Sequence, residues 1–517
     1  MQGRVIMVQG TASHVGKSVL VSALCRIFKQ DGYRVCPFKA QNMSNNSHVT
    51  PNGGEIGRAQ AVQAEAAGVD SRVEMNPVLL KPEADHTSQV VLMGKPLRSA
   101  QALDYFGLKT QLWESVRSSL DILREEYDIV VIEGAGSPAE INLKANEIVN
   151  MRVAMYCNAP VLLCGDIDRG GVFASLIGTL ELLEPEERDI IKGFIINKFR
   201  GDQNLLTDGL DWLENRTGIP VAGVIHHYND IHIPEEDSVA LDLPNRTQSE
   251  SKLDIVVIQI PHISNFDDFD PLTRETGVGL RYVSNKDEIG DPDLIVLPGS
   301  KTTIPDLQWI EQQGLSELII SLNSSGTPVI GICGGYQMLG QELHDPKRIE
   351  SNLTEYPGLG LLPISTTFEG TKETHRIQAT VVKAEGLLTG ALSAPITGYE
   401  IHMGRTSGIK TDQPFLIESR EDNPELFQTT FDGAVNENGD VLGTYIHGLF
   451  HNVLLRQCIL QQVANRRGID ITFSEQQLTM DQEYDKLADW VRSRIDMDLI
   501  YQMTGLDSSH DTLEEAI

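Results

Sequence analysis

Short runs of β-branched and aliphatic residues recur through residues 1–230, and each run is followed by a glycine-rich or acidic loop and then by apolar positions at helical spacing. The first helical pattern covers residues 19–28 and ends at Asp31-Gly32. We expect strands at residues 4–9, 34–38, 128–132, 160–164 and 193–196. Since unbroken apolar strands of this length suit a parallel sheet covered on both faces, the pattern predicts a doubly wound α/β domain.

The pattern changes at residues 231–251, which are rich in charge, proline and serine and have no apolar period. Strand patterns resume at residues 253–260, 293–297 and 327–332 and give way after Pro357 to shorter segments, which predicts a second α/β domain with a mostly parallel sheet. An amphipathic helix is expected from Leu478 to Leu499, with a frayed acidic end. The predicted organisation is therefore a first domain at 1–230, a linker at 231–251, a second domain at 252–455 and a C-terminal helical segment and tail at 456–517.

The composition of the chain argues against a nucleic-acid-binding protein and against a membrane protein. Lys and Arg number 42 against 73 Asp and Glu, so the net charge of −31 repels nucleic acid and anionic membrane surfaces. The apolar runs are far shorter than the ~18 to 20 residues of a membrane span, and the first residues lack the pattern of a signal peptide. The 6 cysteines show no CxxC pairing, which indicates a reducing compartment. We therefore expect a cytoplasmic protein without a nucleic acid or membrane partner; the sequence does not indicate an oligomeric state.

A phosphate-binding loop is predicted at residues 10–18, GTASHVGKS, between the first strand and the first helix. Lys17 would neutralise the β- and γ-phosphates of ATP, and the Ser18 hydroxyl would bind Mg²⁺. The alternative is a glycine-rich turn that binds nothing, but strand, glycines, Gly-Lys-Ser and helix occur here together. The residues expected at the nucleotide are Gly10, Thr11, His14, Val15, Gly16, Lys17 and Ser18.

The loop is one residue longer than the general pattern, and in this it resembles dethiobiotin synthetase and its relatives, which use ATP to act on carboxylates. Glu133, which ends a predicted strand, is our main candidate for a second Mg²⁺ ligand. Lys39 would present another cation at the same sheet edge, or is an ordinary exposed lysine. The resemblance implies that Asn197, followed by Lys198, reads the adenine edge. Weaker candidates for metal or substrate contacts are Glu140, Glu147, Asp166 and Asp168.

A cysteine on a sharp turn marks the second domain. Cys333 lies in GICGGYQ, between a predicted strand and a helix start, where flanking glycines permit the strained turn of a nucleophile elbow. The N–H of Gly334 can donate to an oxyanion, and a second donor is expected from the Gly299 loop. His447, which ends an apolar segment, is the best candidate among the 13 histidines for the base that pairs with the thiol. The alternatives are a buried structural cysteine and a core histidine.

This arrangement resembles a class I glutamine amidotransferase domain, in which a cysteine attacks the side-chain amide of glutamine and releases ammonia. The usual third member is a Glu two residues after the His, but this chain has Leu449 there. Orientation of the imidazole must therefore come from elsewhere or be incomplete, so we expect slow or tightly coupled glutamine hydrolysis. The same departure is typical of the cobyric and cobyrinic acid amidotransferases.

The two sites fit one reaction, because ATP can turn a carboxylate into an acyl phosphate while the second domain delivers ammonia. Many segments together resemble the cobyric acid synthase family: PFKAQNMSNNS, KPEADHTSQVV, VIEGAGSPAEINL, CGDIDRGGVFAS, NKFRGD, LPGSKTT, GICGGYQMLG, GYEIHMG and YIHGLF. The resemblance implies a corrinoid substrate, adenosylcobyrinic acid a,c-diamide, amidated at its b, d, e and g carboxylates with ATP, Mg²⁺ and L-glutamine. The alternatives are the sister enzyme that amidates the a and c carboxylates and, more remotely, a partition-type ATPase switch.

Overall fold

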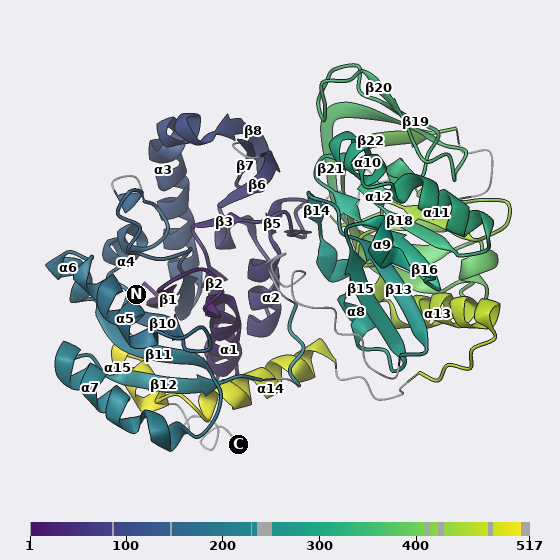
Figure 1. Ribbon diagram of the computed structural model, residues 1–517. Helices are drawn as coiled ribbons and strands as arrows, with labels where there is room; N and C mark the ends of the chain where they lie inside the picture. The colour runs from purple at the N-terminus through teal and green to yellow at the C-terminus, as the bar shows by residue number, and fades with distance from the viewer. Residues whose placement is uncertain are drawn as a thin grey trace, which may run out of the picture.

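The computed structural model describes residues 2–84, 87–144, 147–228, 230–234, 251–408, 413–421, 429–473 and 479–507. They form two lobes joined by a narrow waist (Figure 1). The first lobe contains residues up to 234 together with residues 479–507, and the second lobe contains residues 251–473. Most of the expected linker at 231–251, and the tail after residue 507, lie outside the described residues.

The first lobe is built on a six-stranded, fully parallel sheet in the order β12-β11-β10-β1-β9-β2. Its strands are β1 (Arg4–Gly10), β2 (Val35–Phe38), β9 (Ile129–Glu133), β10 (Val161–Asp166), β11 (Ile191–Phe199) and β12 (Val221–His226). The apolar residues of β1 alternate between two cores: Ile6 and Val8 face α1, whereas Val5 and Met7 face α3. Burial on both faces explains the unbroken apolar strands, and the doubly wound prediction is confirmed.

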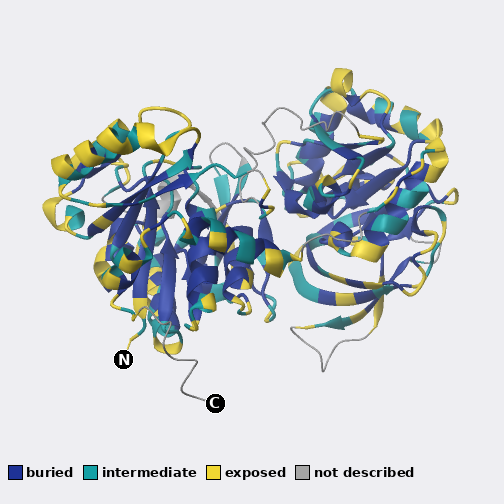
Figure 2. Cartoon of the chain, turned by 90° about the horizontal axis from the view of Figure 1, so that it is seen from below, coloured by how far each residue is buried: buried dark blue, intermediate teal, exposed yellow. Residues whose placement is uncertain are grey.

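Helices cover both faces of this sheet, with exposed outer surfaces and buried strands (Figure 2). They are α1 (Lys17–Gln30), α2 (Arg58–Ala67), α3 (Ala102–Glu126), α4 (Met151–Cys157), α5 (Val172–Glu181), α6 (Pro185–Arg188) and α7 (Thr207–Thr217). Among the described residues, no helix combines the length and hydropathy needed to cross a bilayer.

Between β2 and α3 the chain forms small strands that the sequence pattern did not predict. A four-stranded sheet has the order β3-β6-β7-β8, and a separate hairpin joins β4 to β5. The strands are β3 (Gln41–Met43), β4 (Ser47–Val49), β5 (Glu55–Gly57), β6 (Val78–Ala84), β7 (Thr87–Leu92) and β8 (Lys95–Gln101). The first three have only three residues each, too few to show a period. The β4–β5 hairpin reaches the second lobe.

The second lobe contains a six-stranded sheet in the order β15-β13-β16-β18-β26-β25, parallel except for β25. Its strands are β13 (Leu253–Ile258), β15 (Val278–Val283), β16 (Leu294–Leu297), β18 (Val329–Ile332), β25 (Ala434–Val435) and β26 (Val441–Thr444). The helices are α8 (Asp270–Thr273), α9 (Lys286–Ile289), α10 (Thr303–Gln312), α11 (Leu315–Ser324), α12 (Gly334–Met338) and α13 (Val453–Arg467). This matches the expected second α/β domain.

A mostly antiparallel sheet, in which only the β19–β21 pair is parallel, replaces the short segments expected after Pro357. Strand β21 (Ser365–Val381) pairs along its length with β22 (Pro395–Ser407), and the sheet is completed by β19 (Glu342–His344), β20 (Glu355–Pro357), β23 (Phe415–Arg420) and β24 (Thr430–Asp432). The sequence pattern missed these long strands because their middle residues are polar and half exposed, so no apolar run marks them.

The expected C-terminal segment at 456–517 is divided between the lobes. Helix α13 packs into the second lobe through Leu455 and Ile459, whereas α14 (Met480–Arg492) and α15 (Met497–Thr504) cover α1 and β1 of the first lobe. The single helix expected at 478–499 is two helices, because Asp496 accepts a hydrogen bond from the N–H of Leu499 and so starts a new helix. The last described helices therefore lie on the same lobe as β1 (Figure 1).

Candidate active sites

The predicted phosphate loop joins β1 to α1, so its backbone N–H groups lie at a helix N-terminus. Gly16 has a φ of 97°, and a Cβ there would lie 2.1 Å from Nδ2 of Asn197, so only glycine fits. Nζ of Lys17 donates to the carbonyls of Ala12, at 3.0 Å, and Gly136, at 3.2 Å. The ammonium group of Lys17 therefore lies against the phosphate loop, in position to contact a bound phosphate.

Glu133 ends β9 as a buried carboxylate with an exposure of 1%. Its Oε1 accepts hydrogen bonds from Oγ of Ser18 and from Nζ of Lys39, both at 2.9 Å, and Nε2 of Gln63 donates to Oε2. Burial alone would raise the pKa of the Glu133 carboxyl, but the Lys39 ammonium holds that pKa below its ordinary value. Lys39 therefore lies at the expected sheet edge, buried rather than exposed.

The donor set fits magnesium. Hydroxyl and carboxylate oxygens are the ligands that Mg²⁺ prefers, and Ser18 and Glu133 bring one of each together beside the phosphate loop. Phosphate oxygens and water normally complete such a shell. Among the described residues, no cluster of three or more His, Cys, Asp or Glu offers an alternative metal site.

Asn197 and Lys198 lie at the end of β11 and hold the phosphate loop from outside. Nδ2 of Asn197 donates to the carbonyl of Val15 at 2.8 Å, and its Oδ1 accepts from the N–H of Lys198. Nζ of Lys198 donates to the carbonyl of His14 at 2.6 Å and pairs with Asp166 at 3.0 Å. Both side chains therefore support the loop conformation, and reading of adenine by Asn197 stays a prediction.

The weaker acidic candidates have other contacts. Glu147 accepts hydrogen bonds from the backbone N–H groups of Asn150 and Arg152 at the start of α4. Asp168 pairs with Arg200 at 3.0 Å, and Glu140 is exposed. In the described structure Glu147 and Asp168 therefore have local partners of their own.

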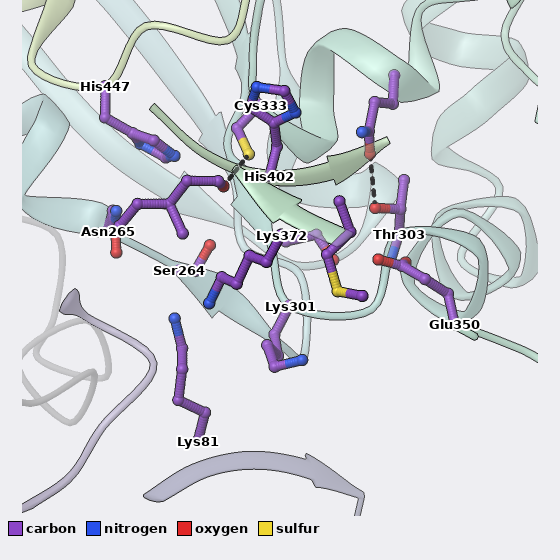
Figure 3. A pocket seen from close by; sticks show the side chains of 14 residues that line it. Lys81, Ser264, Asn265, Lys301, Thr303, Cys333, Glu350, Lys372, His402 and His447 are labelled. Carbon is purple, nitrogen blue, oxygen red and sulfur yellow. Dashed lines mark hydrogen bonds between the residues drawn. The ribbon is translucent and has the colours of Figure 1, made fainter. Parts of the chain in front are cut away.

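Cys333 occupies a strained turn between β18 and α12, with φ 52° and ψ −106°. The turn is packed too closely for side chains on its glycines: a Cβ on Gly335 would lie 2.0 Å from the carbonyl oxygen of Leu297, and one on Gly334 would lie 2.7 Å from the N atom of Ser300. Sγ of Cys333 faces a pocket and lies 3.3 Å from the carbonyl oxygen of Ile401 (Figure 3). This is the geometry of a nucleophile elbow.

His447 lies beside Cys333 and is oriented by Asp268, a residue that sequence reasoning did not select. Nδ1 of His447 lies 2.7 Å from Oδ2 of Asp268, and the other carboxylate oxygen accepts from the N–H of Gly448, also at 2.7 Å. Burial alone would lower the pKa of His447, but the Asp268 carboxylate and the Cys333 sulfur raise it to about 10. The imidazole therefore holds a proton at neutral pH and can pass it to a leaving group.

The two glycines expected to serve an oxyanion flank this pair. Gly299 belongs to β17 (Gly299–Ser300), which pairs with β14 (Ile263–Ser264). A Cβ on Gly299 would lie 3.1 Å from Cε1 of His447, so the strand passes close to the imidazole. Gly334 follows Cys333 at the helix start, where N–H groups point outward. Their positions fit an oxyanion hole, and that role stays a prediction.

The pocket in front of Cys333 has walls from both lobes (Figure 3). The first lobe supplies Lys81, whose Nζ lies 2.6 Å from Oε1 of the buried Glu55. The second lobe supplies Lys372, which pairs with the same carboxylate, and Lys301, which pairs with Glu83 of the first lobe at 2.9 Å. Ion pairs between the lobes therefore border the thiol.

Comparison with known proteins identifies both lobes. A CobB/CobQ-like glutamine amidotransferase domain matches residues 254–454, and a CobQ/CobB/MinD/ParA nucleotide binding domain matches residues 6–239. A cobyric acid synthase of Dehalococcoides mccartyi strain CBDB1 is 54% identical over 96% of this chain and 98% of its own. The chain belongs to the cobyric acid synthase family. A second member, from Desulfitobacterium hafniense strain DSM 10664, is 51% identical over 97% of this chain and 98% of its own.

Among solved structures, PurLQS from Thermotoga maritima aligns with 40% of this chain and 97% of its own, at 19% identity and a TM-score of 0.31. Such a likeness adds nothing to the assignment to the cobyric acid synthase family, which depends on the sequence relatives.

In this member of the cobyric acid synthase family, Leu449 stands where the resemblance leads one to expect a Glu, and Asp268 contacts the imidazole instead. Leu449 is fully buried in the apolar core, whereas the imidazole is oriented from a segment 179 residues earlier in the chain. The only feature of the sequence that could have drawn attention to Asp268 is its place in Phe266-Asp-Asp-Phe269. Adjacent carboxylates are rarely flanked by buried aromatic residues.

The buried carboxyl group of Asp432, which contacts Thr444 and Tyr445 at the end of β26, should make the stability of the protein depend on pH. Burial raises the pKa of Asp432 to about 7, although Thr444 and the N–H of Tyr445 donate to it. Its contribution to stability is complete below about pH 4 and is lost as the pH rises through about 7. We therefore expect Asp432→Asn to raise the free energy of unfolding at pH 8, on the order of a few kcal/mol, and to change it little at pH 4.

Urea unfolding at the two pH values measures this effect, and Glu437→Gln, at an exposed carboxylate, is the control. Equal shifts of Asp432→Asn at both pH values would contradict a titrating buried carboxyl.

Proposed function

We propose that this chain amidates the b, d, e and g carboxylates of adenosylcobyrinic acid a,c-diamide, with glutamine as nitrogen donor and ATP as activator, to give adenosylcobyric acid. One observation carries the proposal: a phosphate loop beside the Ser18–Glu133 pair and a Cys333–His447–Asp268 set occur in one chain. Membership of the cobyric acid synthase family supports the choice of substrate.

In the second lobe, the thiolate of Cys333 attacks the side-chain amide carbon of glutamine, and the N–H groups of Gly334 and Gly299 stabilise the oxyanion. His447 donates its proton to the departing nitrogen, so that the C–N bond breaks and ammonia leaves. Water then hydrolyses the thioester, with His447 as base, to give glutamate and the free thiol. Asp268 keeps Nδ1 of the ring protonated, so that Nε2 faces the reaction.

In the first lobe, Lys17 and the loop N–H groups hold the phosphates of ATP while a substrate carboxylate attacks the γ-phosphorus. ADP leaves, and the product is an acyl phosphate. Mg²⁺, held by Ser18 and Glu133, would offset the charge that develops on the transferred group. Ammonia then attacks the acyl carbon, inorganic phosphate leaves as the C–O bond to the phosphoryl group breaks, and the nitrogen loses a proton to give the amide. Lys39 and Lys198 add positive charge at this sheet edge.

A direct test combines the enzyme with ATP, Mg²⁺, the a,c-diamide and glutamine that carries heavy nitrogen in its side-chain amide. We expect mass spectrometry to show stepwise incorporation of up to four heavy nitrogens, with ADP formed in equal amount. Conversion of unamidated cobyrinic acid, with the diamide left unchanged, would instead identify the sister activity. ATP-dependent binding to vesicles or DNA without amidation would identify a partition-type switch.

Asp268 gives a specific prediction for the glutaminase half. Asp268→Asn would place an N–H donor against Nδ1 and favour the wrong tautomer of His447. In a Ser-His-Asp protease the corresponding change lowers kcat about 10⁴-fold, so we expect a loss of roughly 10²- to 10⁴-fold in glutamine hydrolysis here. Glutamate release measures it. Ammonia-driven amidation should persist, and a parallel loss of that activity would contradict a role confined to His447.

A further inference from the structure

The segment that orients His447 is a short turn, Asn265 followed by the 3-10 turn Phe266–Phe269, which carries Asp268. Asn265 has a φ of 53°, a left-handed conformation that costs energy unless its surroundings hold it. Its Nδ2 donates to Oη of Tyr399, and the Tyr399 ring stacks on the His447 ring at 5.2 Å. The position of the imidazole therefore depends on what holds this turn.

The first lobe holds it through backbone contacts from the β4–β5 hairpin region. The N–H of Ser47 donates to Oδ1 of Asn265 at 3.0 Å, and the N–H of Phe266 donates to Oδ1 of Asn46 at 3.2 Å. These reciprocal bonds join two buried polar segments, so each satisfies groups that the other would leave without partners.

The first lobe also supplies the charge partner of the turn. Nε of Arg58 lies 2.8 Å from Oδ2 of Asp267, the residue next to Asp268, and both side chains are more than nine-tenths buried. The other oxygen of Asp267 has no hydrogen-bond partner among the described residues. A buried carboxylate that loses its cation must move or take up a proton. Arg58 is therefore the contact whose loss would disturb the turn most.

Arg58 is the first residue of α2, so the helix fixes the position of its backbone. The same helix carries Gln63, which donates to Glu133, and Glu65, which pairs with Arg58 at 3.1 Å and accepts from Tyr484 of α14. The guanidinium thus has a fixed direction as well as a fixed position.

We propose that Arg58 is a positioning residue for glutamine hydrolysis: by holding Asp267 across the lobe boundary, it fixes Asp268 and thereby the ring of His447. The second lobe contains the reacting groups, but its catalytic geometry is completed by the first lobe. This inference depends on the proposed glutaminase activity of Cys333.

The test measures kcat and KM for glutamate release by the full-length chain. We expect Arg58→Met to lower kcat about tenfold or more with little change in KM, because the glutamine pocket is untouched and only the imidazole is displaced. Arg58→Lys should recover much of the loss, since it restores the charge. Ammonia-driven amidation should remain. The matched control is Arg26→Met, which removes an equally buried arginine paired with Asp481 and Asp485 of α14.

A second pair of variants guards against a folding defect. Asn46→Ala removes the acceptor for the N–H of Phe266 and leaves Arg58 in place, so it should also lower kcat. Adding Asp267→Asn to Arg58→Met should recover activity, because the unpaired charge is removed. Unchanged kcat in Arg58→Met and Asn46→Ala, or equal loss of ammonia-driven amidation, would overturn the inference. If the unaltered chain released no glutamate, the proposed function itself would fail instead.

Discussion

Cys333→Ala should abolish glutamine-driven amidation and leave ammonia-driven amidation largely intact. The sulfur faces the pocket at a strained turn beside His447, and no other described cysteine lies in that pocket. Removal of the nucleophile stops ammonia release but leaves the phosphate loop of the other lobe untouched. Amide formation on the corrinoid, measured with glutamine and then with a high concentration of ammonium salt, separates the two activities.

Cys458→Ala, at a partly exposed thiol on α13, is the control and should retain both activities. If the Cys333 variant folded normally but lost the ammonia-driven reaction as well, the division of labour between the lobes would be refuted.

Lys17→Ala should remove amidation from either nitrogen source, by at least about 10²-fold, because an acyl phosphate cannot form without charge stabilisation at the transferred phosphoryl group. Nζ of Lys17 also ties Ala12 to Gly136, so its loss should loosen the loop. ADP formation and corrinoid amidation are the measurements. Glutamate release without ATP should continue, because Lys17 begins α1 of the first lobe, whereas Cys333 precedes α12 of the second lobe.

Lys29→Ala, in the last turn of the same helix, controls for loss of a lysine from α1. Full ammonia-driven turnover in the Lys17 variant would mean that the loop is structural only.

The parts of this architecture that could be predicted from the sequence are those determined by residues close together in the chain. The parallel strands have unbroken apolar runs because both of their faces are buried, and β1, β9 and β10 were each expected within a residue or two. The phosphate loop and the Cys333 turn are continuous motifs, in which glycine is required at Gly16 and Gly335 by close backbone packing. Such constraints leave a signature in neighbouring residues.

The parts that could not be predicted depend on distant contacts. Asp268 reaches His447 across 179 residues, and Lys81 enters the glutaminase pocket from the other lobe. Strands β21 and β22 are stabilised by pairing with each other, so their half-exposed polar residues gave no period to detect. Nothing in the sequence around Arg58 or Asp267 indicates that the two pair across the lobe boundary.

The return of α14 and α15 to the first lobe has a consequence for biosynthesis of the protein. Apolar residues of these helices, among them Leu487, Val491 and Ile500, complete the core beneath α1 and β1. In the chain these helices follow the whole second lobe, so a ribosome makes them after it. During synthesis, part of the apolar surface of the nucleotide-binding lobe therefore stays uncovered until α14 and α15 have been made. A fragment that stops at the linker would keep this surface exposed and would be prone to aggregation.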